Sequence, residues 1–134
     1  MKIQTMIEEL KNSGVFQLDN PVYIGILPND GEIIAGYPQA ILTFDETDFN
    51  IYTFKGIRHF SFDGNVYQFK FSEIKEIELG KYNFRNPYLK ISFADQKYLA
   101  FGYYLRAKNY LPQKTNIEKF IAQLSSIATE VEEY

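Results

Sequence analysis

The chain contains no cysteine and no tryptophan, and His59 is its single histidine among 134 residues. Without cysteine it forms no disulfide and offers no thiolate to a metal or a substrate. No apolar stretch approaches the roughly 18 residues of a membrane-spanning helix. The N-terminal sequence MKIQTMIEELKNSG has two glutamates where a signal peptide needs an apolar segment. These absences favour a cytoplasmic protein that does not span a membrane.

The motifs of common enzymes and metal sites are also missing. There is no G-x-S-x-G sequence for a nucleophilic serine and no glycine-rich phosphate loop. Asp45, Glu46 and Asp48 gather in one turn, but turn chemistry accounts for aspartate there and a full set of oxygen ligands for a cation is not evident. The sequence therefore predicts no enzyme, no metal site and no cofactor.

Aromatic residues are plentiful, with 12 Phe and 11 Tyr, and hydrophobic residues make up 46% of the chain. This composition excludes general disorder and predicts one domain, residues 1–134, with its own core. Two interpretations of the aromatic surplus stay open. The rings form a phenylalanine core with a tyrosine rim, or some of them line a binding interface, where aromatics concentrate.

The formal net charge of −3 hides an uneven distribution. Residues 1–54 hold two basic and eight acidic residues, whereas residues 55–119 hold twelve basic and six acidic ones. Such asymmetry either marks an anionic partner or reflects two segments that attract each other in the fold.

Apolar spacing predicts a helix at each end of the chain. Residues 2–13 have helical periodicity and end at Ser13-Gly14. Residues 116–129 form the clearer helix, because Thr115 and Glu118 fit a capping box. The apolar face of this closing helix consists of Ile117, Phe120, Ile121, Leu124 and Ile127. The acidic tail after it is expected to fray.

Between the helices, residues 21–104 contain seven segments with strand character: 21–27, 37–44, 49–55, 66–71, 74–81, 88–93 and 97–103. Phe44 and Phe49 can pair across a short loop, and Asp63-Gly64 is typical of a turn. In the stretch YLKISFADQKYLAFGYY, the apolar residues share one face only if the loop between the strands has an odd length. A three-residue loop, residues 94–96, satisfies this and places Gln96 in a left-handed conformation.

Two blocks of the sequence resemble bacterial pleckstrin-homology-like (PH-like) domains. AILTFDETDFNIYTFKG resembles a strand pair with the pattern L-x-L-T-x-x-x-L-I-x-Y. The block FKFSEIKEIELGKYNFRNPYLKISFADQKYLAF resembles the strands that follow, and IEKFIAQL resembles the closing helix. The similarity covers residues 22–129, although residues 102–114 are longer than the usual link to the helix. The resemblance implies a mainly β fold, a partly open barrel of about seven antiparallel strands closed by the C-terminal helix.

The same resemblance raises the question of phosphoinositides, which many PH-like domains bind through basic residues between the first two strands. In this chain that loop, residues 28–36, holds Asp30 and Glu32 and no base. Two carboxylates repel an anionic headgroup. We therefore predict no specific phosphoinositide binding.

Basic residues interleaved with tyrosine and phenylalanine do occur later in the chain, a combination used to bind single-stranded nucleic acid. The candidate anion-binding residues are Lys81, Arg85, Arg106, Lys108 and Lys114. They form a site only if their loops converge, and otherwise they are solvated. The predicted function is thus a non-catalytic binding or scaffolding module that contacts a protein partner, with an extended peptide added at a free sheet edge as one mode. The alternative is a module for an anionic ligand, a lipid headgroup or single-stranded nucleic acid. The oligomeric state is left open.

Overall fold

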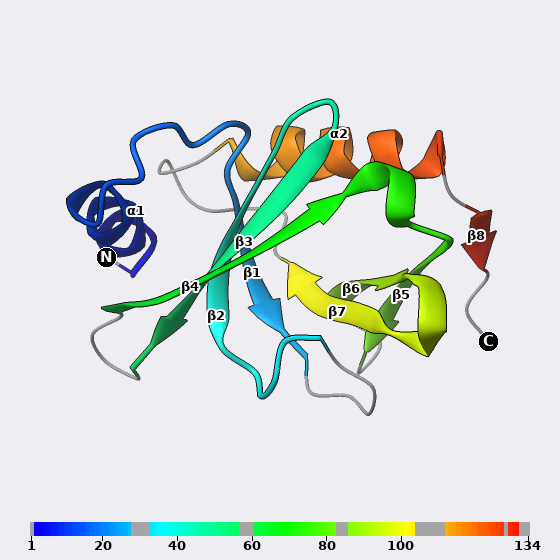
Figure 1. Cartoon of the computed structure of the whole chain (residues 1–134), viewed down its shortest axis with the longest axis horizontal. Helices are drawn as coiled ribbons and strands as arrows, with labels where there is room; N and C mark the ends of the chain where they lie inside the picture. The colour runs from blue at the N-terminus through cyan, green and yellow to red at the C-terminus, as the bar shows by residue number, and fades with distance from the viewer. Residues whose placement is uncertain are drawn as a thin grey trace.

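The computed structural model describes residues 2–27, 33–56, 61–82, 86–103, 112–127 and 129–131 (Figure 1). Eight strands form one sheet in the order β4-β3-β2-β1-β7-β6-β5-β8. The elements in chain order are α1 (Lys2–Asn12), β1 (Val22–Ile26), β2 (Gln39–Phe44), β3 (Asp48–Lys55), β4 (Ser61–Lys70), η1 (Phe71–Glu73), β5 (Glu76–Tyr82), β6 (Asn86–Ser92), η2 (Ala94–Gln96), β7 (Tyr98–Tyr103), α2 (Gln113–Ser125) and β8 (Thr129–Val131).

The seven predicted strands are all present, and each pairs antiparallel with its neighbours in this open sheet. The prediction of a frayed tail is wrong for residues 129–131. These residues form β8, which pairs in parallel with the first half of β5, Glu76 lying beside Thr129 and Glu78 beside Val131. The free edge of β5 explains this pairing, because an unpaired edge offers backbone donors and acceptors to any extended segment. Residues 132–134 lie outside the described residues.

The two predicted hairpin registers are confirmed. Phe44 lies opposite Phe49 in the β2–β3 pair. In the β6–β7 pair, Leu89 lies opposite Phe101 and the three-residue connection is η2. Gln96 adopts the left-handed conformation, with φ of 61°, as the odd-length loop requires.

The predicted turn at Asp63-Gly64 is wrong, because β4 runs through it as one strand of ten residues. Gly64 has a positive φ of 88°, and the register between β3 and β4 shifts at this point. Tyr52 pairs with Val66 and Phe54 pairs with Phe62. Between these two pairs, β4 therefore contains two more residues than β3. The turn signal marks a β-bulge, which uses the same left-handed glycine that a tight turn needs.

The main core lies between the inner face of the sheet and α2, which crosses one end of the strands (Figure 1). Ile117, Phe120 and Leu124 of α2 are fully buried there, as the sequence predicts. The ring of Phe120 lies 5.1 Å from that of Phe44 and 5.3 Å from that of Phe49, between ring centroids. Ile127 does not belong to this face: α2 ends at Ser125, and Ile127 is 49% exposed.

The predicted capping box is wrong, because α2 begins at Gln113 and not at residue 116. The cap residue is Pro112, whose carbonyl oxygen accepts a bond from the Asn116 backbone N–H at 2.9 Å. Thr115 and Glu118 are therefore exposed residues inside the helix. The early start follows from tertiary contacts of the first turn, which outweigh a local cap.

Those contacts are made by two buried amides. The Gln113 side-chain oxygen accepts a bond from the Tyr23 backbone N–H at 2.8 Å, and its side-chain nitrogen donates to the Tyr23 carbonyl at 2.7 Å. The Asn116 side-chain nitrogen donates to the Pro21 carbonyl at 3.0 Å. Gln113 and Asn116 are only 2% and 6% exposed. They join α2 to the chain just before Ile24, the residue of β1 that forms the last pair with β7, opposite Tyr103.

Helix α1 packs on the outer face of β2, β3 and β4 and forms a second, smaller core (Figure 1). Met6 and Leu10 of α1 are fully buried against Ile41, Tyr52 and Phe54. The sheet is thus covered on both faces, by α2 inside and by α1 outside. None of the described helices is both long and apolar enough to cross a membrane.

Candidate functional site

The basic residues predicted to bind an anion are only partly within the described residues. Arg85, Arg106 and Lys108 lie outside them. Lys81 lies near the end of β5 and is exposed, and Lys114 is exposed in the first turn of α2. They lie on different elements, and the convergence of the basic loops stays a prediction.

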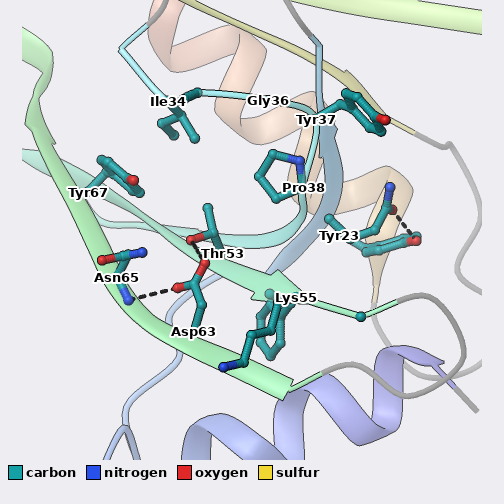
Figure 2. A pocket seen from close by; sticks show the side chains of 14 residues that line it. Tyr23, Ile34, Gly36, Tyr37, Pro38, Thr53, Lys55, Asp63, Asn65 and Tyr67 are labelled. Atoms are coloured by element: carbon teal, nitrogen blue, oxygen red, sulfur yellow. Dashed lines mark hydrogen bonds between the residues drawn. The ribbon is translucent and has the colours of Figure 1, made fainter.

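A different feature stands out, a groove of about 830 Å³ where the chain entering β2 passes over the ends of β3 and β4 (Figure 2). One wall comes from residues 34–38, and the other comes from β3 and from β4 around its bulge. Its lining residues are Tyr23, Ile34, Ala35, Gly36, Tyr37, Pro38, Gln39, Thr53, Phe54, Lys55, Gly56, Asp63, Asn65 and Tyr67.

The β4 bulge determines the chemistry of the groove. The extra residues turn the Asp63 side chain toward β3, where one carboxylate oxygen accepts a bond from the Thr53 hydroxyl at 2.7 Å. Its other oxygen accepts a bond from the Asn65 backbone N–H at 2.8 Å. Thr53 is only 1% exposed, so the carboxylate is anchored to a buried group. Bulges commonly redirect a side chain in this way at binding sites.

The walls beside this carboxylate include apolar and aromatic side chains. Ile34 is buried, Pro38 and Tyr67 are half-buried, and all three lie around the groove in Figure 2. Tyr37 stands at the rim and is 74% exposed. At the other end of the groove, the Tyr23 hydroxyl donates to the Gln39 side-chain oxygen. The groove therefore combines a fixed acceptor with surfaces that can pack against a ligand.

The charged groups that line the groove are few. Asp63 and Lys55 are the two charged residues among its lining, and no ion pair joins them within the described part of the chain. A nucleophile, base and orienting group in mutual contact would be needed for acyl or proton transfer. Within the same described residues, no group of three or more His, Asp or Glu side chains could hold a metal ion.

A second groove, of about 530 Å³, lies between the β2–β3 turn and α2. Several of its polar groups already have partners. The Asp45 carboxylate accepts bonds from the backbone N–H groups of Asp48 at 2.9 Å and Thr47 at 2.8 Å, and these two bonds lower the Asp45 pKa. Lys119 donates to the Asn20 side chain at 2.9 Å. The acidic cluster seen in the sequence is thus part of a turn.

Sequence reasoning did not identify the bulge groove. The signal was present in Asp63-Gly64, which the sequence predicts as a hairpin turn, with Asn65 directly after it. The sequence does not reveal that Thr53 is the hydrogen-bond partner of Asp63, because Thr53 lies ten residues earlier and has the pattern of an ordinary strand residue.

No protein-family model matches the sequence, and no curated protein is significantly similar to it. Solved structures are similar in fold. The hSac2 domain from the human phosphoinositide phosphatase Sac2 has a TM-score of 0.57 at 8% identity, over 100% of this chain and 92% of that chain. The C-terminal domain of an unknown protein from Leishmania infantum has a TM-score of 0.55 at 11% identity, over 92% of this chain and 99% of that one. Together with the seven antiparallel strands and the closing helix, these similarities show that the chain has a PH-like fold.

Proposed function

We propose that this protein is a non-catalytic binding module that contacts a protein partner through the groove at the β4 bulge. The observation that carries the proposal is the groove itself. It is open, it measures about 830 Å³, and it combines a fixed carboxylate with apolar and aromatic walls. Binding sites in proteins combine apolar surface with a few polar groups that fix the orientation of the ligand.

The strand that borders the groove supports an extended partner. β4 is the last strand at its end of the sheet, so in the described residues no further strand pairs with its outer edge. Unpaired backbone groups at such an edge can receive an added strand. The longer regular stretch of β4 is residues 66–70, where Val66 is 49% exposed. A segment added there would run past the groove and could place one side chain in it.

The alternative function, binding of a lipid headgroup or single-stranded nucleic acid, gains no support from the described residues. Lys81 and Lys114 lie on different elements, β5 and α2, and the groove presents the carboxylate of Asp63. A carboxylate repels phosphate. The alternative remains a proposal that depends on residues 83–85 and 104–111, which the structure does not describe.

Filling the groove tests the proposal. In the Asn65→Trp variant an indole occupies the groove, while the backbone N–H that holds Asp63 is kept. The matched control is Ser125→Trp, which adds the same ring at an exposed position on α2. Both proteins are immobilised and used to capture partners from a lysate at near-physiological salt.

We expect one protein to be retained by the parent chain and by Ser125→Trp, and to be lost with Asn65→Trp. Equal capture by all three would refute the groove as the binding site. Retention of nucleic acid or anionic vesicles in place of a protein, with steep loss on adding salt, would favour the alternative.

A further inference from the structure

We propose that the bulge groove binds a cationic side chain, arginine or lysine, supplied by an extended segment of the protein partner. This inference rests on the proposed function and names the chemistry that the groove recognises. It is carried by the geometry of Asp63 and by the surfaces on either side of it.

The first step is that the carboxylate is held in place before any ligand arrives. One oxygen of Asp63 is bonded to the buried Thr53 hydroxyl, and the other is bonded to the Asn65 backbone N–H. Both anchors lie on the paired strands β3 and β4, and Gly64 permits the backbone conformation that brings them together. A ligand therefore meets a fixed acceptor and does not have to order it, which favours affinity.

The second step is that the carboxylate retains acceptor capacity. An ionised carboxylate offers about four lone-pair sites, and the two hydrogen bonds of Asp63 use one on each oxygen. The remaining pair of sites, one per oxygen, matches the forked donors of a guanidinium group. An ammonium group can satisfy the same pair less specifically.

The third step is that no residue described in the structure forms an ion pair with this carboxylate. Lys55 lines the same groove, but no ion pair between Lys55 and Asp63 is present in the described structure. A cation from outside is thus the group that would complete the site.

The fourth step concerns the walls, which suit the stem of a long basic side chain. Ile34 and Pro38 face Tyr67 across the groove in Figure 2, with Thr53 and Asp63 below them. Long basic side chains bury their methylene groups against apolar surface while the charged end finds a polar partner. The Tyr67 ring can also attract a cation held close to its face.

A matched pair of small probes tests this inference. N-acetyl-arginine amide carries the guanidinium group, and N-acetyl-citrulline amide is its neutral counterpart of nearly the same shape. Each is added to the full, ¹⁵N-labelled chain, and the backbone amide signals of Thr53, Asn65 and Tyr67 are followed by NMR. The charge-removing variant is Asp63→Asn, which can still bond Thr53 and the Asn65 N–H. The control variant is Asp48→Asn, which removes a carboxylate at the other end of β3, outside the groove.

We expect the arginine amide to shift these signals in the parent chain and in Asp48→Asn, and the citrulline amide to shift them far less. Affinity for the arginine amide should fall about ten- to a hundredfold in Asp63→Asn, since a hydrogen bond to a charged group contributes about 1.5–3 kcal/mol. The Asn65→Trp variant keeps the carboxylate but blocks access, and should also lose binding.

Two results would overturn the inference: equal shifts with both probes, or no shift at arginine amide concentrations that saturate a millimolar site. If either result is found and the Asn65→Trp substitution still abolishes capture of the protein partner, the proposed function stands. Capture that Asn65→Trp does not affect would refute the proposed function as well.

Discussion

Replacing Gln113 by leucine would remove the hydrogen bonds that join α2 to the backbone of β1. Leucine has a similar volume and strong helix propensity, so the helix itself should persist. The Tyr23 N–H and carbonyl would both lose the hydrogen bond that they make with the Gln113 side chain. Because Gln113 is 2% exposed, water has little access to replace it.

The size of the effect follows from these two groups. A buried donor or acceptor left without a partner costs about 1–3 kcal/mol, so the Gln113→Leu variant should lose about 2–6 kcal/mol of unfolding free energy. This is a large share of the roughly 5–15 kcal/mol that stabilises a domain. Urea denaturation followed by circular dichroism measures the loss as a lower midpoint at similar slope.

The chain offers a matched control in Gln123→Leu, the same substitution in the same helix. The Gln123 side-chain nitrogen donates to the Asp45 carbonyl at 2.8 Å, but this bond is exposed and water can replace it. We expect a loss of under about 1 kcal/mol there. Equal losses in the two variants would refute the assignment of Gln113 as a buried tie between α2 and β1.

Replacing Gln113 by glutamate removes the side-chain N–H donor and keeps the oxygen acceptor, so it tests the donor alone. The introduced carboxylate could still accept from the Tyr23 N–H, but it would face the Tyr23 carbonyl without a hydrogen to donate. Burial and this repulsion should raise the pKa of the introduced carboxyl above its unfolded value. The variant should then be most stable below the unfolded pKa, and lose stability as the pH rises through the folded one.

Four further predictions concern the core, the acid limit of stability and, in the last two, anions. Phe120→Ala should cost about 3–5 kcal/mol in denaturation, because the fully buried ring leaves a cavity; an unchanged melting curve would show that α2 does not close the core. Asp45→Asn should weaken the pH dependence of stability below about pH 3.8. The lowered pKa of Asp45 stabilises the folded chain above that pH, and this stability is lost as the pH falls and the folded form becomes protonated. An unaltered acid unfolding profile would contradict this. Liposome sedimentation should show no headgroup-selective phosphoinositide binding, and selective binding lost on substitution within residues 28–36 would overturn that prediction. If the parent binds anionic vesicles or a single-stranded oligonucleotide at low salt, Arg85→Glu with Lys108→Glu should reduce it, whereas no parental binding would end the anion hypothesis.

The fold was largely predictable because its signals are local. The alternation of apolar and polar residues predicted the strands. The odd length of the β6–β7 loop predicted both the register of this strand pair and the left-handed conformation of Gln96. The errors arose where distant residues decide the outcome. The start of α2 depends on Tyr23, 90 residues earlier, and β8 depends on the free edge of β5. No window of local sequence contains such partners.

The candidate site was less predictable for the same reason. A hairpin turn and a bulge can both use a glycine in the left-handed conformation, so the Asp63-Gly64 sequence is compatible with either. Local sequence does not separate the two. The difference lies in β3, whose pairing continues on both sides of the bulge. Of the basic residues predicted to bind an anion, Lys81 lies on β5 and Lys114 on α2, and the convergence of their loops depends on residues that the structure does not describe.

The central position of β1 has a consequence for biosynthesis. β1 forms a hairpin with β2 soon after it is made, but its other edge pairs with β7 and then with Gln113, which follows Tyr23 by 90 residues. Until then a growing chain carries one apolar strand with an open edge, which is a common cause of misassembly during translation. Closing so long a loop also slows folding. We therefore expect the nascent chain to reach its native fold only once the first turn of α2 has left the ribosome.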